Sequence, residues 1–152
     1  MTLRRAGLDD MPAVARLHRH TVATSLPFVP HLHTPAEDAW WFAERLYPAN
    51  QVWLFDDEAG PAAYIAFRPA FIEHLFVRPD QQSRGLGAQL LARAQEGSDE
   101  LSLWTFQQNH RARAFYERHG FAAVTFTDGA DNEEKLPDVL YRWRRFPISG
   151  AE

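Results

Sequence analysis

Apolar and polar residues alternate along this chain in a pattern that predicts short strands and amphipathic helices. Thr2–Arg5 predicts a strand, and the two aspartates that follow predict the start of a helix. The apolar stripe of this helix is formed by Met11, Val14, Ala15, His18 and Val22. His18 lies on the stripe, and we interpret it as a core or half-buried histidine bonded to backbone rather than as a catalytic group.

A second helix is predicted after the loop Ser25–Thr34, because Thr34-Pro35-Ala36-Glu37 forms a capping box with proline at the first helical position. One face of this helix carries Ala36, Trp40, Ala43 and Tyr47, whereas Phe42 lies about 200° around from Trp40. An apolar second face leaves three alternatives open. The helix lies between the core and a partner subunit, it lines a substrate cleft, or its extra apolar residues are simply exposed.

The rest of the chain predicts a meander followed by alternating helices and strands. The predicted strands are Gln51–Phe55, Ala62–Phe67, Phe71–Val77, Leu101–Phe106, Phe121–Phe126 and Val139–Trp143. Helices are predicted from Arg84 to about Gly97 and from the cap residue Asn109 to Gly120. We therefore expect a single domain over residues 1–146 and a short, disordered C-terminal tail over residues 147–152.

Composition excludes several classes of function. With 152 residues, 45% of them hydrophobic, the chain can bury a substantial core, and its formal net charge of −4 argues against a nucleic-acid or anionic-membrane binder. The absence of cysteine excludes disulfides, thiolate-zinc sites and a cysteine nucleophile. No window approaches the ~20 apolar residues of a membrane span, so a soluble cytoplasmic protein is expected.

The first candidate for chemistry is the turn Gln82-Ser83-Arg84-Gly85-Leu86-Gly87-Ala88. A turn that follows a strand and opens a helix presents unpaired backbone N–H groups and a positive dipole end, which suit a phosphate diester. Glycines allow close approach of the ligand, although the same glycines also occur where tight packing alone requires them. The motifs of dinucleotide-binding and P-loop proteins are absent.

The second candidate motif follows one strand later, as Asn109-x-x-Ala112-x-x-Phe115-Tyr116-Glu117-x-x-Gly120-Phe121. Together with Val77-Arg78-Pro79 before the turn, it makes nearly the whole chain resemble the GNAT acyltransferase superfamily. The resemblance implies a GNAT fold of the α/β class, with a mixed sheet as in α+β proteins. The sheet would be mostly antiparallel and have about six to seven strands, with four helices and a V-shaped splay between the fourth and fifth strands.

The resemblance also implies the donor site, which is for acetyl-CoA. The backbone of Leu75, Phe76 and Val77 would pair with the pantetheine arm like an added strand. The turn residues Gln82, Ser83, Arg84, Gly85, Leu86, Gly87 and Ala88 would bind the pyrophosphate. Asn109 would bond the pantetheine or line the cleft, and Phe115 would pack along the cofactor.

Tyr116 stands where the family commonly has the tyrosine that protonates the departing CoA thiolate. A phenol with a pKa near 10 is protonated at neutral pH and can donate to a thiolate whose conjugate acid has a pKa near 8.5. The alternative is a core aromatic residue. Glu73 and His74 are the candidate bases, but they alternate on one strand, so only one can face the cleft. We favour a water-mediated relay with Glu73 on family analogy.

The sequence contains weaker signals for the residues that bind the acceptor amine. Phe28, His31, His33 and Trp41 are candidates because the loop between the first two helices borders the acceptor entrance in the resembled family. The two loop histidines lack a third ligand at motif spacing, so no metal is expected. The acidic segment Asp128–Asp138 would attract a cationic amine or is simply a solvated turn.

The sequence as a whole predicts an N-acetyltransferase that moves an acyl group from CoA to a primary amine by direct attack in a ternary complex. A small-molecule acceptor is favoured, and a homodimer is a further expectation. Two alternatives stay open: acetylation of a protein or peptide, and a non-catalytic acyl-CoA sensor of the same fold.

Overall fold

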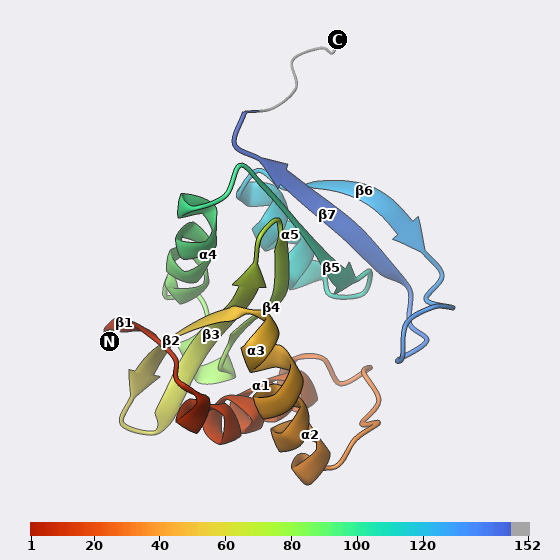
Figure 1. The fold of residues 1–152 in the computed structure, drawn as a ribbon. Helices are drawn as coiled ribbons and strands as arrows, with labels where there is room; N and C mark the ends of the chain where they lie inside the picture. Colours follow the sequence, from red (N-terminus) through yellow and green to blue (C-terminus); the bar gives the residue numbers. More distant parts are fainter. Residues whose placement is uncertain (147–152) are drawn as a thin grey trace. The chain divides into compact units, whose positions relative to one another are not determined.

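A computed structural model describes residues 1–146 of the protein, which form two units (Figure 1). The first unit comprises Met1–Arg68 and Ile72–Ala94, and the second comprises Pro69–Phe71 and the chain from Gln95 onward. The predicted tail, residues 147–152, lies outside the described residues. A single domain over residues 1–146 stays a prediction.

Antiparallel strands form the sheet of the first unit. These strands are β1 (Leu3–Arg5), β2 (Gln51–Asp57), β3 (Gly60–Arg68) and, from its second residue, β4 (Phe71–Val77). β2 and β3 pair in antiparallel register along their whole length, and β1 adds to the outer edge of β2. Gly60 closes the β2–β3 hairpin with a φ of 107°, a conformation that L side chains rarely adopt. The predicted hairpin and the meander are confirmed.

The helices of the first unit are α1 (Met11–Ser25), α2 (Pro35–Trp41), η2 (Phe42–Leu46), α3 (Tyr47–Ala49) and α4 (Leu86–Glu96), with short turns η1 (Leu8–Asp10) and η3 (Pro79–Gln81). The predicted capping box is present, since the Thr34 hydroxyl accepts from the Glu37 N–H and the Glu37 carboxylate accepts from the Thr34 N–H. α2, η2 and α3 follow one another without a break.

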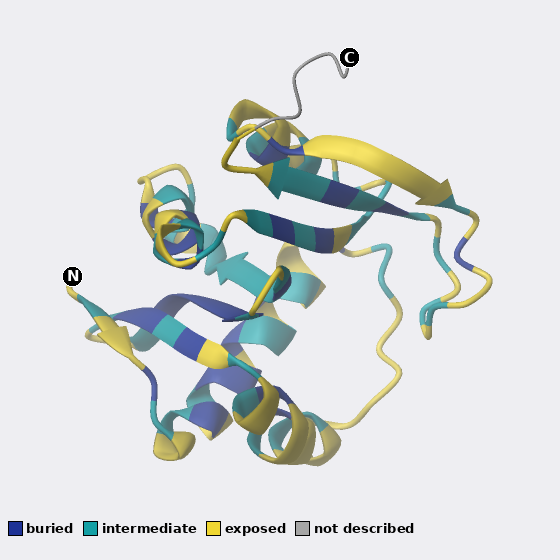
Figure 2. Cartoon of the chain, turned by 45° about the horizontal axis from the view of Figure 1, so that its top comes forward, coloured by how far each residue is buried: buried dark blue, intermediate teal, exposed yellow. Residues whose placement is uncertain are grey.

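Side chains from α1, η2, β2 and β3 form the core of the first unit (Figure 2). Its members include Met11, Val14 and Leu17 of α1, Phe42 and Leu46 of η2, and Val52, Leu54, Tyr64 and Ala66 of the hairpin. Alternation along β2 directs Trp53 away from this cluster, and there the guanidinium of Arg93 on α4 lies 4.0 Å from its ring centroid. The sheet is therefore covered by α1 on one face and α4 on the other.

The two apolar faces of the helical segment Pro35–Ala49 differ in burial. Phe42 and Leu46 are buried, Ala43 and Tyr47 are partly buried, whereas Ala36 and Trp40 are exposed. The physical reason is that η2 is a π-helical turn, which holds more residues per turn than an α-helix and so shifts the positions that face the core.

The second unit is a three-stranded antiparallel sheet covered by one helix. Its elements are β5 (Glu100–Phe106), α5 (His110–Arg118), β6 (Ala122–Thr127) and β7 (Asp138–Arg144), with β7 between β5 and β6. Tyr116 packs with Phe121 and with Tyr141 of β7. β6 is exposed along nearly its whole length (Figure 2).

The strand order is β1-β2-β3-β4-β5-β7-β6, and the parallel step from β4 to β5 is made by Phe71 and Ser102 within the second unit. The prediction of a mixed α/β fold with a mostly antiparallel sheet is confirmed, and the sheet has seven strands. The V-shaped splay between the fourth and fifth strands stays a prediction. Within residues 1–146, no helix is long and apolar enough to cross a membrane.

Candidate active site

The turn that leads into α4 has an unusual backbone. Ser83 and Gly85 both have left-handed φ values, 66° and 82°, and residues 83–85 are exposed. Positive φ values at alternate positions allow the tightly curved backbone in which successive N–H groups point to one anion. A Cβ built on Gly85 would meet no atom within 4 Å, so the space beside this glycine is open. The turn therefore offers backbone donors and an approach for a phosphate at the N-terminus of α4.

Two side chains of the turn differ in what they contact. Gln82 folds back, its Nε2 donating to the Val77 carbonyl at 3.0 Å and to the Ser25 hydroxyl at 3.4 Å. Arg84 is exposed and makes no hydrogen bond or ion pair within residues 1–146. Gln82 thus anchors the turn to β4 and α1, whereas Arg84 is available to a ligand.

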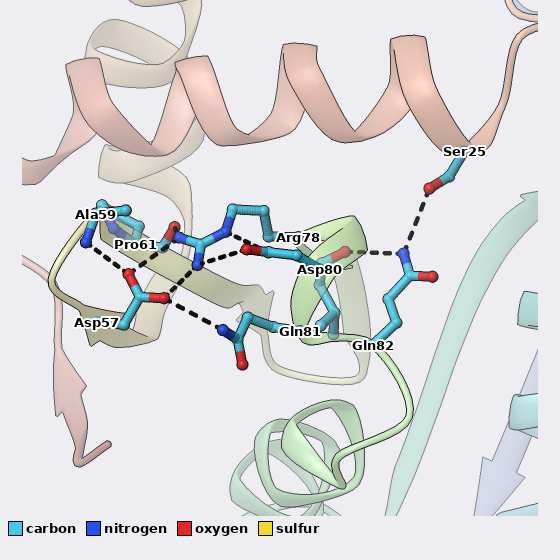
Figure 3. A network of polar contacts seen from close by, with 9 residues as sticks. Ser25, Asp57, Ala59, Pro61, Arg78, Asp80, Gln81 and Gln82 are labelled. Atoms are coloured by element: carbon cyan, nitrogen blue, oxygen red, sulfur yellow. Dashed lines mark hydrogen bonds and ion pairs between the residues drawn. The ribbon is translucent and has the colours of Figure 1, made fainter.

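An ion-pair network centred on Arg78 secures the chain just before the turn (Figure 3). Arg78 forms ion pairs with Asp57, at the end of β2, and with Asp80, whose carboxylate lies 2.6 Å from Nε. Its Nη1 also donates to the Pro61 carbonyl at 3.3 Å, and Gln81 donates to Asp57 at 3.3 Å. The side chain of Arg78 is only 13% exposed. Sequence analysis missed this network, because Asp80 lies two residues from Arg78 but Asp57 lies 21 residues from it, and no local pattern links the two.

The network has a consequence for stability in acid. Hydrogen bonding to Arg78 lowers the pKa of Asp57, so the folded state favours the ionised carboxylate. This contribution to stability is present above the ordinary carboxyl pKa, and it is lost as the pH falls below about 4 and through the lowered pKa. We expect the free energy of unfolding, measured by urea titration, to fall less steeply on acidification in Asp57→Asn than in the wild type.

Glu58→Gln is the matched control for that measurement. Glu58 is exposed on the same turn and takes no part in the network. Its substitution should leave the acid dependence unchanged. Equal slopes for the wild type and Asp57→Asn would show that Arg78 does not stabilise the carboxylate.

The two candidate bases on β4 have different partners. Glu73 accepts a hydrogen bond from Arg68 Nη1 at 2.8 Å, and its carboxylate is one-third exposed. The Nδ1 atom of His74 lies 2.9 Å from the Tyr64 hydroxyl, and its ring is surrounded by aromatic side chains. Burial lowers the pKa of His74 well below its usual range. Both residues lie in the middle of β4, each in a distinct environment.

The predicted pantetheine-binding segment follows directly. Leu75, Phe76 and Val77 are half-buried at the C-terminal end of β4. The parallel register pair of β4 with β5 lies at the other end of the strand, at Phe71. Backbone pairing of these three residues with a ligand stays a prediction.

In the second unit, two buried tyrosines are bonded differently. The Tyr141 hydroxyl donates to Glu117 at 2.5 Å and accepts from Arg113 Nε at 3.0 Å. Tyr116 is buried to 7% exposure, yet its hydroxyl has no hydrogen-bond partner among residues 1–146 and is not enclosed. Burial raises the pKa of Tyr116 above its usual range, which keeps the phenol protonated. Of the two, Tyr116 has the hydroxyl that is free to act on a ligand.

The other predicted residues of this unit flank Tyr116. Asn109 caps α5, since its Oδ1 accepts from the Ala112 N–H at 3.2 Å, which leaves its amide nitrogen as a donor. The Phe115 ring is half-buried and packs against Tyr116 and His119.

The predicted acceptor-binding residues all belong to the first unit. Phe28 is half-buried, and His31 and His33 are exposed in the loop after α1. Trp41, at the end of α2, packs against Phe42 and lies 5.6 Å from the His74 ring centroid. The structure therefore brings Trp41 to the candidate site on β4.

The acidic loop between β6 and β7 is held together by its own hydrogen bonds. Asn132 bonds to Leu136 and to Asp138, and Lys135 donates to the Ala130 carbonyl at 2.7 Å. A Cβ on Gly129 would lie 2.2 Å from the Leu136 carbonyl oxygen, so only glycine fits there. In the part of the chain that the structure describes, no group of three or more His, Asp or Glu residues could hold a metal ion.

Comparison with known proteins identifies the class. Residues 48–123 match the family model described as the acetyltransferase (GNAT) domain. The chain belongs to the GNAT acetyltransferase family and is an N-acetyltransferase.

Three similar proteins illustrate the range of the family. The peptidyl-lysine N-acetyltransferase YiaC of Escherichia coli is 26% identical over 144 residues, covering 93% of this chain and 95% of YiaC. The N-acetyltransferase PaiA of Thermoplasma acidophilum, solved in complex with coenzyme A, has a TM-score of 0.70 at 15% identity, covering 94% of this chain and 98% of PaiA. YncA of Salmonella typhimurium, solved with its cofactor acetyl-CoA, has a TM-score of 0.71 at 17% identity, covering 97% and 95% of the two chains.

Proposed function

We propose that this protein transfers an acetyl group from acetyl-CoA to a primary amine by direct attack in a ternary complex. The observation that carries the proposal is the turn before α4, where Ser83 and Gly85 have left-handed φ values in the exposed, open backbone of a GNAT domain. A negatively charged pyrophosphate is the kind of group that such a turn binds.

Each candidate donor-binding group has its own role in this proposal. The backbone N–H groups of residues 83–88 and the free guanidinium of Arg84 would bind the pyrophosphate. The backbone of residues 75–77 would pair with the pantetheine amides, and the amide nitrogen of Asn109 would donate to the same arm. Phe115 would supply an apolar contact along it.

The reaction needs one proton removed and one delivered. The amine nitrogen, as a neutral nucleophile, attacks the thioester carbonyl; the C–N bond forms and the C–S bond breaks, releasing the thiolate. We assign Glu73 to remove the amine proton through water, since its carboxylate is partly exposed. We assign Tyr116 to protonate the thiolate, because its hydroxyl has no hydrogen-bond partner among residues 1–146. No covalent enzyme intermediate is needed.

Two classes of acceptor compete. A small amine is favoured by the aromatic side chains of Trp41, Phe42 and Phe76 around His74, which give this part of the β4 site apolar surroundings. The lysine side chain of a protein is favoured by the similarity to YiaC, whose name gives that substrate.

Release of free thiol from acetyl-CoA distinguishes these hypotheses. Measured against small amines, amino acids and lysine-containing peptides, the rate should rise above the acceptor-free rate with at least one small primary amine. A rate that rises with peptides alone would establish the protein acceptor instead. Binding of acetyl-CoA without thiol release in the presence of any acceptor would support the sensor and overturn the proposal.

A further inference from the structure

Two histidines from separate elements of the first unit lie face to face beside the candidate site. The rings of His18 on α1 and His74 on β4 are 4.8 Å apart and nearly parallel, with an interplanar angle of 4°. Phe76 meets both rings edge-on, and Phe42 packs against both at 5.4 and 5.7 Å. Aromatic packing on several sides therefore fixes the plane of the His74 imidazole.

Tyr64 determines which nitrogen of His74 carries the proton. Tyr64 is fully buried, and its hydroxyl lies 2.9 Å from His74 Nδ1, its one partner among the described residues. A buried hydroxyl that donates no hydrogen bond loses the free energy of that bond. The same hydroxyl loses less if its oxygen accepts no hydrogen bond. The hydroxyl therefore donates to Nδ1, which leaves the proton of the neutral ring on Nε2.

The surroundings keep this ring neutral. Stacking on His18 and burial both oppose a positive charge, and burial also lowers the pKa of His18 to about 4. Asp38 acts on His18 in the opposite sense, but its carboxylate is paired with Arg19 at 2.7 Å, and Tyr64 is protonated. Desolvation therefore outweighs the attraction of Asp38, and both imidazole rings are neutral near pH 7.

The remaining nitrogen is open to a ligand. Among residues 1–146, two side-chain polar atoms are fully buried without a hydrogen-bond partner, Thr21 Oγ1 and Gln81 Oε1. Nε2 of His74 is not one of these fully buried atoms. Since Nδ1 is occupied and the described residues provide no acceptor for Nε2–H, this N–H reaches solvent. A neutral N–H in apolar surroundings recognises an oxygen acceptor such as a carbonyl, and it cannot accept a proton from an amine.

We propose that His74 is a fixed hydrogen-bond donor to a carbonyl oxygen of the bound substrates, not a base, with Tyr64 and His18 as its positioning residues. The inference rests on the proposed function, because the carbonyl belongs to the thioester or to the acceptor. A donor to the thioester oxygen would stabilise the negative charge that develops there during attack. A donor to the acceptor would select amines that carry a neighbouring carbonyl.

The tautomer can be measured in the protein without turnover. A multiple-bond ¹H–¹⁵N correlation spectrum near neutral pH, with the His74 signals assigned by their loss in His74→Gln, should show a neutral ring protonated at Nε2. Tyr64→Phe should give a mixture of tautomers. A charged ring, or a proton on Nδ1 in the wild type, would overturn the proposal whether or not the protein is active.

Kinetics then separate a donor from a base. His74→Phe should lower kcat/KM by about 10²-fold, whereas His74→Gln, which retains an N–H donor, should stay within about 10-fold of the wild type. The acidic limb of the pH–rate profile should persist in both variants and be lost in Glu73→Gln. Loss of the limb in His74→Gln, or full activity in His74→Phe, would contradict the donor role.

A comparison of two acceptors shows which carbonyl oxygen accepts the hydrogen bond from His74. A loss in His74→Phe that is equal for a simple alkylamine and for an amino-acid amide would place the donor at the thioester. A loss confined to the amide would place it at the acceptor. A loss confined to the alkylamine would contradict both.

Discussion

Tyr116→Phe is expected to lower kcat by about 10²- to 10⁴-fold with little change in CoA affinity. The variant retains the ring that packs with Phe121 and Tyr141 and removes only the hydroxyl, which has no partner in the described protein. Burial raises the pKa of this phenol, which makes it a weaker acid in the free enzyme. A thiolate excluded from water also binds protons more strongly, so transfer between the two remains feasible. Acetyl transfer under saturating acetyl-CoA, and CoA binding by calorimetry, would measure the two effects.

Tyr141→Phe is the matched control in the same unit. It deletes a hydroxyl that is bonded to Glu117 and Arg113, so it should lower the free energy of unfolding by about 1–3 kcal/mol and leave kcat nearly unchanged. If both variants turned over at the wild-type rate, Tyr116 would be a core aromatic residue and the proton would come from elsewhere.

Gly85→Ala should weaken CoA binding by about 10- to 100-fold while the protein stays folded. A left-handed φ costs an L residue about 1–2 kcal/mol, so the turn either stores this strain or relaxes and misaligns its N–H groups. The added methyl group also enters the open space through which a phosphate would approach. Titration with CoA and with dephospho-CoA should give similar losses, since both carry the pyrophosphate.

Substitutions at two other glycines distinguish the effect of backbone strain from a loss of CoA binding. Gly60→Ala introduces a methyl group at a φ of 107° with no atom within 4 Å, and it should lower stability without changing CoA affinity. Gly97→Ala, also in open space but without a left-handed φ, should change neither. CoA affinity that falls equally in Gly60→Ala and Gly85→Ala would mean that the turn does not contact the donor.

Local signals were sufficient to predict most of the fold. The Thr34 capping box, the hairpin turn ending at Gly60 and the Asn109 cap are interactions between residues close in sequence, and each appears as predicted. The face of the segment Pro35–Ala49 that packs on the core was not predicted, because hydrophobic spacing interpreted at 3.6 residues per turn left two apolar faces. A π-helical turn has no clear sequence signal, since packing against the hairpin decides whether it forms.

The candidate site could be predicted only as separate groups. Sequence motifs and the family resemblance made the phosphate turn, Glu73, His74 and Tyr116 candidates, and their roles stay predictions. The stacking of His18 on His74 links positions 56 residues apart, and the pairing of Arg78 with Asp57 links positions 21 apart. Such contacts depend on how α1 packs on the sheet and on the β2–β3 register, which no local pattern reports.

The π-helical turn Phe42–Leu46 also bears on how such chains diverge. It contains one residue more than the α-helical turn it replaces, so deleting a single residue there would restore an ordinary helix. The residues on either side would keep nearly the same relative orientation, because the π-helical turn holds its extra residue within a single turn. Trp41, which packs against Phe42 beside His74, would therefore keep its place. A single-residue length difference in this segment would thus be absorbed locally, without moving the aromatic side chains around His74.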